Sequence, residues 1–151
     1  MATETERIRR VDLDTEMHNW VIGGISGFVA GSIFGAMMSG TPYMEDVAAL
    51  FGLSDPAAGW FIHLAFSIVF AWIFVALASF EQFSRYAHRP STGAGLGVTY
   101  GVLVWFFAGS VMFPLWLTGS FRIEPNFLTL VGHIVFGAFL GAMYPIVLAH
   151  D

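Results

Sequence analysis

The chain has 151 residues, of which 56% are hydrophobic and only 11% charged, and its formal net charge is −5. Soluble domains carry roughly 25% charged residues, and one water-soluble core of this length cannot bury so much apolar surface, so the composition predicts an integral membrane protein. The sequence has no cysteine, which excludes disulfides, thiolate metal sites and cysteine nucleophiles.

Four long apolar runs follow one another along the chain. Each is close to the roughly 20 residues that a helix needs to cross a bilayer, and a spanning segment must be helical because lipid offers its backbone no other partner. The runs are 19–39, 59–80, 93–117 and 127–148. They predict an all-α membrane protein with a four-transmembrane-helix bundle. The domain boundaries that follow are a cytoplasmic N-terminal tail, 1–18, and a single transmembrane domain, 19–151.

The arginines predict the orientation of these helices, because short cytoplasmic loops are enriched in basic residues. Most arginines precede the first run or lie between the second and third runs, and they indicate that these segments are cytoplasmic. Arg122, between the third and fourth runs, indicates the opposite orientation. The majority set is Arg7, Arg9, Arg10, Arg85 and Arg89. It predicts a multi-pass protein of the cell (plasma) membrane with its N-terminus and C-terminus in the cytoplasm.

The first outer loop, "TPYMEDVAALFGLSDP" (41–56), carries helix signals of its own. Thr41 and Pro42 suit a helix start, and the acidic residues at 45 and 46 favour the positive end of a helix dipole. Gly52 can end such a helix. The loop therefore predicts a short helix that lies in the membrane interface.

A shift of 70 residues aligns the first two runs with the last two. Three glycines of the first run then coincide with three of the third, and His63 coincides with His133. The glycine pairs are Gly23 with Gly93, Gly27 with Gly97, and Gly31 with Gly101. The coincidence predicts a parallel 2+2 internal repeat about an axis along the membrane normal.

Glycines also recur at every fourth position along three of the runs. They are Gly23, Gly27, Gly31 and Gly35 in the first run, Gly93, Gly97 and Gly101 in the third, and Gly137 and Gly141 in the fourth. Such ridges let two helix backbones approach closely, so they predict tight helix packing within one bundle or across a homodimer. The alternative is that they clear space for a flat cofactor or a lipid.

His63 and His133 lie inside apolar runs, where an ionisable side chain is costly and normally has a partner or a function. Burial favours the neutral imidazole, which is also the form that binds metals. Three interpretations stay open. Each histidine hydrogen-bonds a neighbouring helix, a carbonyl or a water and fixes the helix packing; both ligate one haem iron; or both line a polar pocket for a small solute or quinone.

The order of a glycine-rich helix and a histidine helix, repeated once, resembles one haem level of the cytochrome b four-helix bundle. "GGISGFVAG" (23–31) and "GAGLGVTYG" (93–101) stand for the glycine helices, and His63 and His133 for the ligands. The resemblance implies a haem-b electron-transfer protein, although that family carries two histidines on each ligand helix and this chain carries one. The chain as a whole resembles small uncharacterised four-helix integral membrane proteins of archaea and bacteria, which implies location alone.

The sequence offers no catalytic set. The apolar runs contain no Asp, Glu or Arg, and the chain has no P-loop, no HExxH motif and no basic patch for nucleic acid. We therefore expect no enzyme and no cofactor, but a non-catalytic accessory or structural subunit of a membrane complex or homo-oligomer, surrounded by lipid. The alternatives are haem b held by His63 and His133, and a small channel or carrier for a neutral solute.

Overall fold

The computed structural model describes the backbone of residues 4–148 and the side chains of residues 17–147. Within these residues all regular structure is helical. Four helical stretches are long and apolar enough to cross a membrane: Met17–Met37, Pro56–Ala78, Pro90–Thr118 and Phe127–Val147. The predicted all-α bundle of four spanning helices is thereby confirmed, and the protein fits a multi-pass membrane protein.

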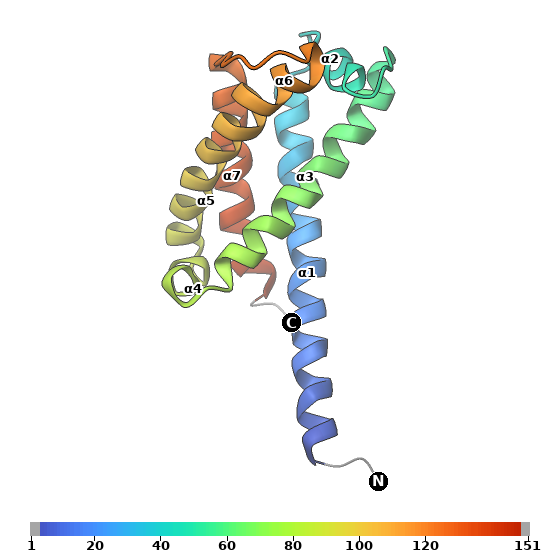
Figure 1. Ribbon diagram of the computed structural model, residues 1–151. Helices are drawn as coiled ribbons and strands as arrows, with labels where there is room; N and C mark the ends of the chain where they lie inside the picture. The colour runs from blue at the N-terminus through green and yellow to red at the C-terminus, as the bar shows by residue number, and fades with distance from the viewer. Residues whose placement is uncertain (1–3, 149–151) are drawn as a thin grey trace.

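The first helix, α1 (Glu4–Met37), is longer than its membrane span. Its N-terminal part extends beyond the bundle (Figure 1), so residues 4–18, which belong to the predicted N-terminal tail, are helical. The side chains of Arg7, Arg9 and Arg10 fall outside the described ones. The cytoplasmic orientation of the termini therefore stays a prediction.

Two of the spanning helices, α3 (Pro56–Ala78) and α7 (Phe127–Leu148), begin at side-chain caps. The Asp55 carboxylate accepts a hydrogen bond of 3.0 Å from the Ala57 N–H. The side-chain oxygen of Asn126 accepts from two N–H groups of the first turn of α7, at 2.9 and 3.2 Å. These bonds satisfy N–H groups that have no partner inside the helix.

The third span changes its winding along its length. It begins as α5 (Pro90–Val104), continues as a π-helical segment, η1 (Trp105–Met112), and ends as α6 (Phe113–Thr118). A π-helix is rare and is frequently found at functional sites. The apolar run 93–117 predicted the span but not this change of winding.

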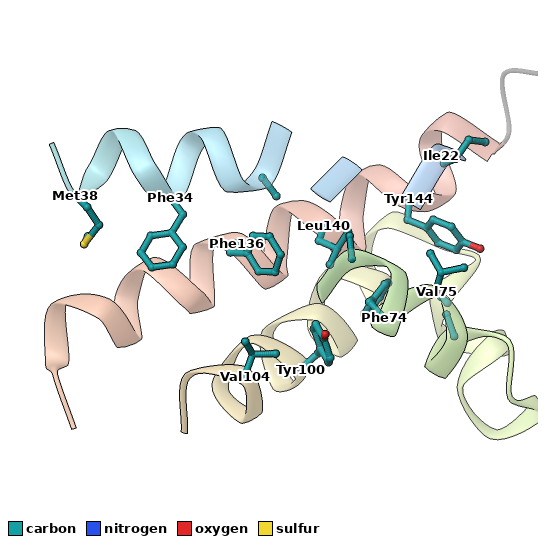
Figure 2. Packing of buried hydrophobic residues seen from close by; sticks show 14 residues of the cluster. Ile22, Phe34, Met38, Phe74, Val75, Tyr100, Val104, Phe136, Leu140 and Tyr144 are labelled. Atoms are coloured by element: carbon teal, nitrogen blue, oxygen red, sulfur yellow. The ribbon is translucent and has the colours of Figure 1, made fainter. Parts of the chain in front are cut away.

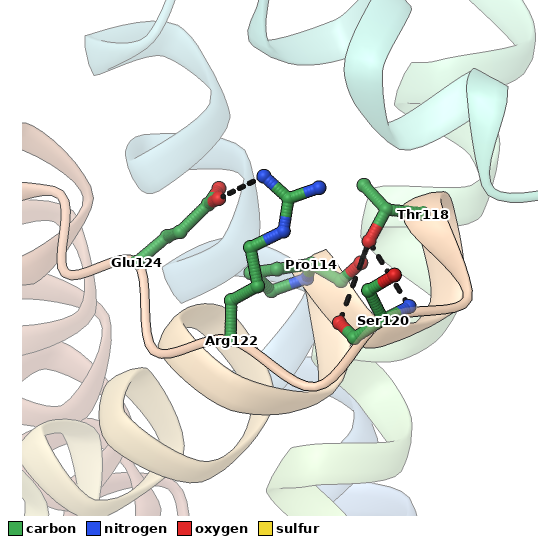
Figure 3. Close-up of polar contacts among 5 residues, drawn as sticks. All are labelled: Pro114, Thr118, Ser120, Arg122 and Glu124. Carbon is green, nitrogen blue, oxygen red and sulfur yellow. Dashed lines mark hydrogen bonds and ion pairs between the residues drawn. The ribbon is translucent and has the colours of Figure 1, made fainter.

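Pro114 sets the hydrogen bonding where η1 meets α6. Proline has no N–H, so the carbonyl of Ser110 loses its α-helical donor. The backbone N–H of Glu124, in the loop after α6, donates to that carbonyl at 2.9 Å. Within α6 the Thr118 hydroxyl donates to the Pro114 carbonyl at 2.8 Å, and in the loop after it Arg122 pairs with Glu124 at 3.1 Å (Figure 3). Arg122, the arginine that disagrees with the predicted orientation, is therefore paired with an acidic residue of its own loop.

Short helices lie at both ends of the bundle (Figure 1): α2 (Tyr43–Ala49) beside α6, and α4 (Glu81–Ala87) at the opposite end. The first is the helix predicted in the loop 41–56. Met44 and Val47 of α2 are buried, and Gly52 has a φ of +71°, which lets the chain turn after the helix.

The four long helices are arranged as two pairs, α1 with α3 and α5 with α7, joined where α1 meets α7. Contact between α3 and α5 is slight. It is made by Tyr100, whose hydroxyl donates to the Phe70 carbonyl at 2.7 Å and whose ring lies 5.5 Å from that of Phe74. Towards the α2–α6 end, α3 leans away from η1 and α6 (Figure 1).

A cluster of buried apolar side chains follows the length of α7 (Figure 2). Phe136, Leu140 and Tyr144 lie in a row along α7, with Phe34 of α1 near one end of the row, and the Tyr144 ring lies 6.2 Å from that of Phe74 on α3. Burial of such side chains contributes about 1.5–3 kcal/mol each in water, but between lipid-surrounded helices the close contacts themselves supply the attraction. The core therefore joins all four long helices, with Phe74 of α3 in contact with Tyr100 of α5 and Tyr144 of α7.

Candidate functional site

The glycines of α5 lie directly on the backbone of α7. A β-carbon placed on Gly93, Gly97 or Gly101 would come closer than 3.0 Å to a carbonyl oxygen of α7. The oxygens belong to Gly141, Gly137 and His133, respectively. Contacts between glycine Cα–H groups and carbonyls recur at such helix interfaces. The α5–α7 pair is thus joined backbone to backbone.

The glycines of α1 lie mainly against side chains, and only Gly27 also meets backbone atoms of α3 within 3.4 Å. Gly27 faces the Ala71 methyl and the Ser67 carbonyl, and Gly31 faces the Ser67 side chain. Gly23 faces Val75, and Gly35 faces Trp60 of α3 and Met44 of α2. The ridges thus make helix contacts inside one chain.

The contact positions in the two pairs correspond at the shift of 70. Gly27 lies against positions 67 and 71, and Gly97 lies against 137 and 141. This correspondence fits the predicted 2+2 arrangement, although a duplication of the sequence stays a prediction.

His63 links two helices. Its Nε2–H donates to the Gly31 carbonyl of α1 at 2.9 Å, and the side chain is 5% exposed. The Ser67 hydroxyl, one turn further along α3, donates to the His63 carbonyl at 2.8 Å. The first interpretation of the histidines, a hydrogen bond that ties neighbouring helices, describes this contact.

His133 bonds within its own helix. Its Nδ1–H donates to the Thr129 carbonyl at 2.7 Å, and the side chain is 8% exposed. Its ring lies against Phe34, with a centroid distance of 4.8 Å, and the His63 ring lies 5.1 Å from the same phenyl ring. Phe34 in turn rests on Gly132, where a β-carbon would not fit. The two histidines therefore come together through one shared aromatic neighbour.

Both imidazoles line a cavity of about 800 Å³ in the α2–α6 half of the bundle. It occupies the region where α3 diverges from η1 and α6. Its walls are mainly apolar and include Phe34, Phe66, Phe70, Phe107, Trp116 and Phe136. Ligand sites are typically concave, mainly apolar, and fitted with a few polar groups.

The polar groups of the cavity, apart from the histidines, come from α2, α3, α6, α7 and the loop before α7. They are Tyr43, Asp46, Ser67, Thr118, Glu124, Asn126 and Thr129. Burial raises the pKa of Tyr43, so its hydroxyl stays protonated. Burial, followed by repulsion from Glu45, raises the pKa of Asp46. No Lys or Arg belongs to the described lining.

Aromatic contacts cover the cavity at the α2–α6 end. The Phe51 ring, just after α2, lies 6.3 Å from that of Phe66 on α3 and 5.5 Å from that of Trp116 on α6. The wall residues Phe107, Met112 and Trp116 are 61%, 52% and 54% exposed, respectively. The side between α3 and the η1–α6 segment, which would face the lipid of a bilayer, is therefore open, and Asp46 and Glu124 of the lining are exposed at the α2–α6 end as well.

Two hydrogen bonds connect the η1 wall to the loop before α7. The Trp105 indole N–H donates to the Asn126 carbonyl at 3.1 Å, and the Glu124 N–H donates to the Ser110 carbonyl, as described above. These bonds lie near both ends of η1 and fix the wall that carries Phe107.

Sequence reasoning selected both histidines but missed Phe34, Tyr43 and Asn126. Asn126 could have been identified from the sequence, because an asparagine just before an apolar run is a typical N-cap of the helix that follows. Phe34 had none, since it is one of 16 phenylalanines spread over all four runs. Its position on Gly132 depends on how α1 meets α7.

The arrangement offers a mainly apolar space with two buried imidazoles. No group of three or more His, Cys, Asp or Glu side chains that could hold a metal ion occurs among the described residues. The two imidazoles are fixed by backbone carbonyls and face an apolar space. Comparison of the chain with protein-family models, with curated proteins and with solved structures gave no match.

Proposed function

We propose that this integral membrane protein is a non-catalytic binder, either a receptor or a carrier, of a small uncharged and mostly apolar molecule. The observation that carries the proposal is the cavity that contains both His63 and His133. Its volume of about 800 Å³ lies within the range of roughly 300–1,000 Å³ that is typical of ligand sites. Among the functions expected from the sequence, this supports the neutral-solute alternative.

The charge of the cavity disfavours an anionic ligand. Asp46 and Glu124 line it, and no basic side chain of the described lining faces them. Arg122, near Glu124, is already paired with it. An anion would meet these carboxylates without a compensating cation, and a buried charge without a partner is costly.

The sideways opening favours a ligand that reaches the cavity from the bilayer. Phe51 bridges α3 and α6 at the end of the bundle, whereas the side between α3 and η1 has exposed aromatic walls. A molecule dissolved in lipid meets this opening without leaving hydrocarbon, so no water-filled path across the bundle is needed.

A haem-b protein is the second candidate, because both histidines line one cavity. Three contacts fit it poorly: the Nε2–H of His63 is held by Gly31, Phe34 lies against both imidazoles, and the ridge glycines pack helices instead of lining the cavity. The visible spectrum after haem supplementation tests it. A Soret band that disappears in both His63→Ala and His133→Ala would replace the binder with the haem protein.

The expected role as an accessory or structural subunit, or as a homo-oligomer, is compatible with a ligand cavity. The helix faces that point away from the core carry large apolar side chains, among them Phe28, Phe61 and Phe139, which suit either lipid or a partner helix. Native mass spectrometry in mild detergent would detect a bound partner or a second copy.

Binding is tested with two uncharged amphiphiles, 4-octylphenol and its methyl ether 4-octylanisole, titrated into the protein in nanodiscs. We expect saturable binding of at least one of them. Ala108→Phe fills the cavity from the η1 wall and should weaken this binding at least tenfold, about 1.4 kcal/mol. Ala76→Phe, on an exposed position of α3, is the matched control and should bind like the unmodified chain. Non-saturable partitioning that is the same in all three proteins would refute the proposal.

A further inference from the structure

The two histidines present hydrogen-bond acceptors to the cavity. A carbonyl oxygen can only accept, so the ring nitrogen that bonds to it must carry the hydrogen. This nitrogen is Nε2 in His63 and Nδ1 in His133. A neutral imidazole has one N–H, so Nδ1 of His63 and Nε2 of His133 are left as acceptors. Neither ring has a second hydrogen bond among the described residues.

The hydroxyl groups of the cavity also present acceptors, and not donors, to a ligand. Ser67, Thr118 and Thr129 donate their hydrogens to backbone carbonyls at 2.8, 2.8 and 2.9 Å, respectively. Each hydroxyl has a single hydrogen to donate, so only its oxygen lone pairs are left for a ligand. The carboxylates of Asp46 and Glu124 are acceptors as well.

Donors are few and belong to the α2–α6 end. Among the described lining they are the Tyr43 hydroxyl on α2, the Trp116 indole N–H on α6, and the amide N–H₂ of Asn126, whose oxygen is used to cap α7. Around the histidines, Ser67 and Thr129 leave only acceptors for a ligand, and the donor on this side is the Tyr43 hydroxyl, whose ring lies 5.7 Å from that of His63.

The ring of His133 is the better placed of the two for a ligand. Its Cε1 atom lies 3.6 Å from the position of a β-carbon on Gly109, a residue of the η1 cavity wall. The ring of His63 is instead surrounded by Phe34, Tyr43 and Trp60. An acceptor enclosed in apolar surroundings without a donor costs free energy, and a ligand that donates a hydrogen bond removes that cost.

We propose that the ligand is an uncharged hydroxyl compound, a phenol or alcohol with an apolar body, whose O–H donates to Nε2 of His133. The inference rests on the proposed binding function and specifies the chemistry of its ligand. Ketones, ethers and esters of the same shape lack the donor and leave the acceptor unsatisfied. A carboxylate lacks the donor and also meets Asp46 and Glu124.

The methyl ether of the ligand pair tests this directly, because it keeps the shape and the oxygen but loses the hydrogen. In the unmodified chain we expect 4-octylphenol to bind about fivefold to tenfold more tightly than 4-octylanisole. In His133→Phe the ratio should fall to about one, because the aromatic ring is kept while the acceptor is lost. His88→Gln, in the turn after α4 at the opposite end of the bundle, is the control and should keep the ratio.

Each outcome decides one question. Equal saturable binding of the phenol and the ether overturns the hydroxyl inference but leaves the binding function intact. Saturable binding of neither compound overturns the binding function itself. Tighter binding of octylammonium than of 4-octylphenol shows that a cation, not a neutral hydroxyl, is preferred, and overturns the inference. If His133→Phe does not fold, the phenol-to-ether ratio of the unmodified chain still decides.

Discussion

The α1–α3 pair and the α5–α7 pair use the same spacing of glycines but meet their partners differently. In α5–α7, glycine faces glycine, and each Cβ that is missing from one helix makes room for a carbonyl of the other. In α1–α3, the glycines of α1 face Val75, Ala71 and Ser67, so the side chains of α3 fill the gap. Glycine spacing therefore determines which faces meet, and the residues opposite determine how closely.

The histidines of the two pairs also differ in which helix they bond to. His63 bonds across to α1, so the looser pair gains a polar link between its helices. His133 bonds to its own helix, because the α5–α7 pair is already held by its backbones. As a result the His133 ring is turned towards the cavity wall, while the His63 ring lies between two helices.

The largest expected effect is in the tight pair. Gly97→Ala places a methyl group against the Gly137 carbonyl, which is backbone and cannot rotate away, so we expect a loss of about 3 kcal/mol or more in the free energy of unfolding. Gly95→Ala, on the same helix with open space around it, is the matched control and should change stability by less than about 1 kcal/mol. Unfolding in SDS measures both, and equal midpoints would contradict the backbone-to-backbone contact.

A smaller and reversible effect is expected in the looser pair. Gly31→Ala meets the side chain of Ser67 and should cost about 1–3 kcal/mol. Since that obstacle is a side chain, adding Ser67→Gly should restore more than half of the loss, and a double-mutant cycle on SDS unfolding measures the coupling. Strictly additive effects would show that the Ser67 side chain is not the obstacle, and that the two pairs do not differ in whether a side chain or the backbone faces the glycine.

The smallest effect concerns the histidines. His63→Phe removes the bond between α3 and α1 and should cost about 1 kcal/mol, close to values measured for hydrogen bonds between membrane helices. His133→Phe removes a bond within α7 and should cost less. The reverse order, in the same unfolding assay, would mean that His133 is the structural histidine and His63 the one free to meet a ligand.

Most of the fold could be predicted from the sequence, because spans depend on the length of apolar runs. The first run, 19–39, differs from the span Met17–Met37 by two residues at each end. The short helix in the loop 41–56 was also predictable from local turn and cap residues. The spans and the short helix are determined by residues that are close together in the sequence, so one sequence is enough to predict them.

The cavity could not be predicted in this way. It exists because α3 and η1 diverge, and the winding of η1 depends on Pro114 together with a donor from a loop ten residues after it, Glu124. The sequence pointed to His63 and His133 but not to the Phe34 ring that both contact. Which atoms the histidine nitrogens bond, and hence whether they donate or accept, depends on tertiary contacts alone.

The two bonds that tie η1 to the loop before α7 have a mechanical consequence. Trp105 and Ser110 are anchored to Asn126 and Glu124, so the loop cannot lift without leaving a carbonyl of the span unpaired, at a cost of several kcal/mol in hydrocarbon. A change of η1 from π-helical to α-helical winding would rotate Phe107 about the helix axis and would strain the two hydrogen bonds to the loop. The winding of η1 and the position of the loop are thus linked by these two hydrogen bonds, in the wall beside which a lipid-soluble molecule would pass.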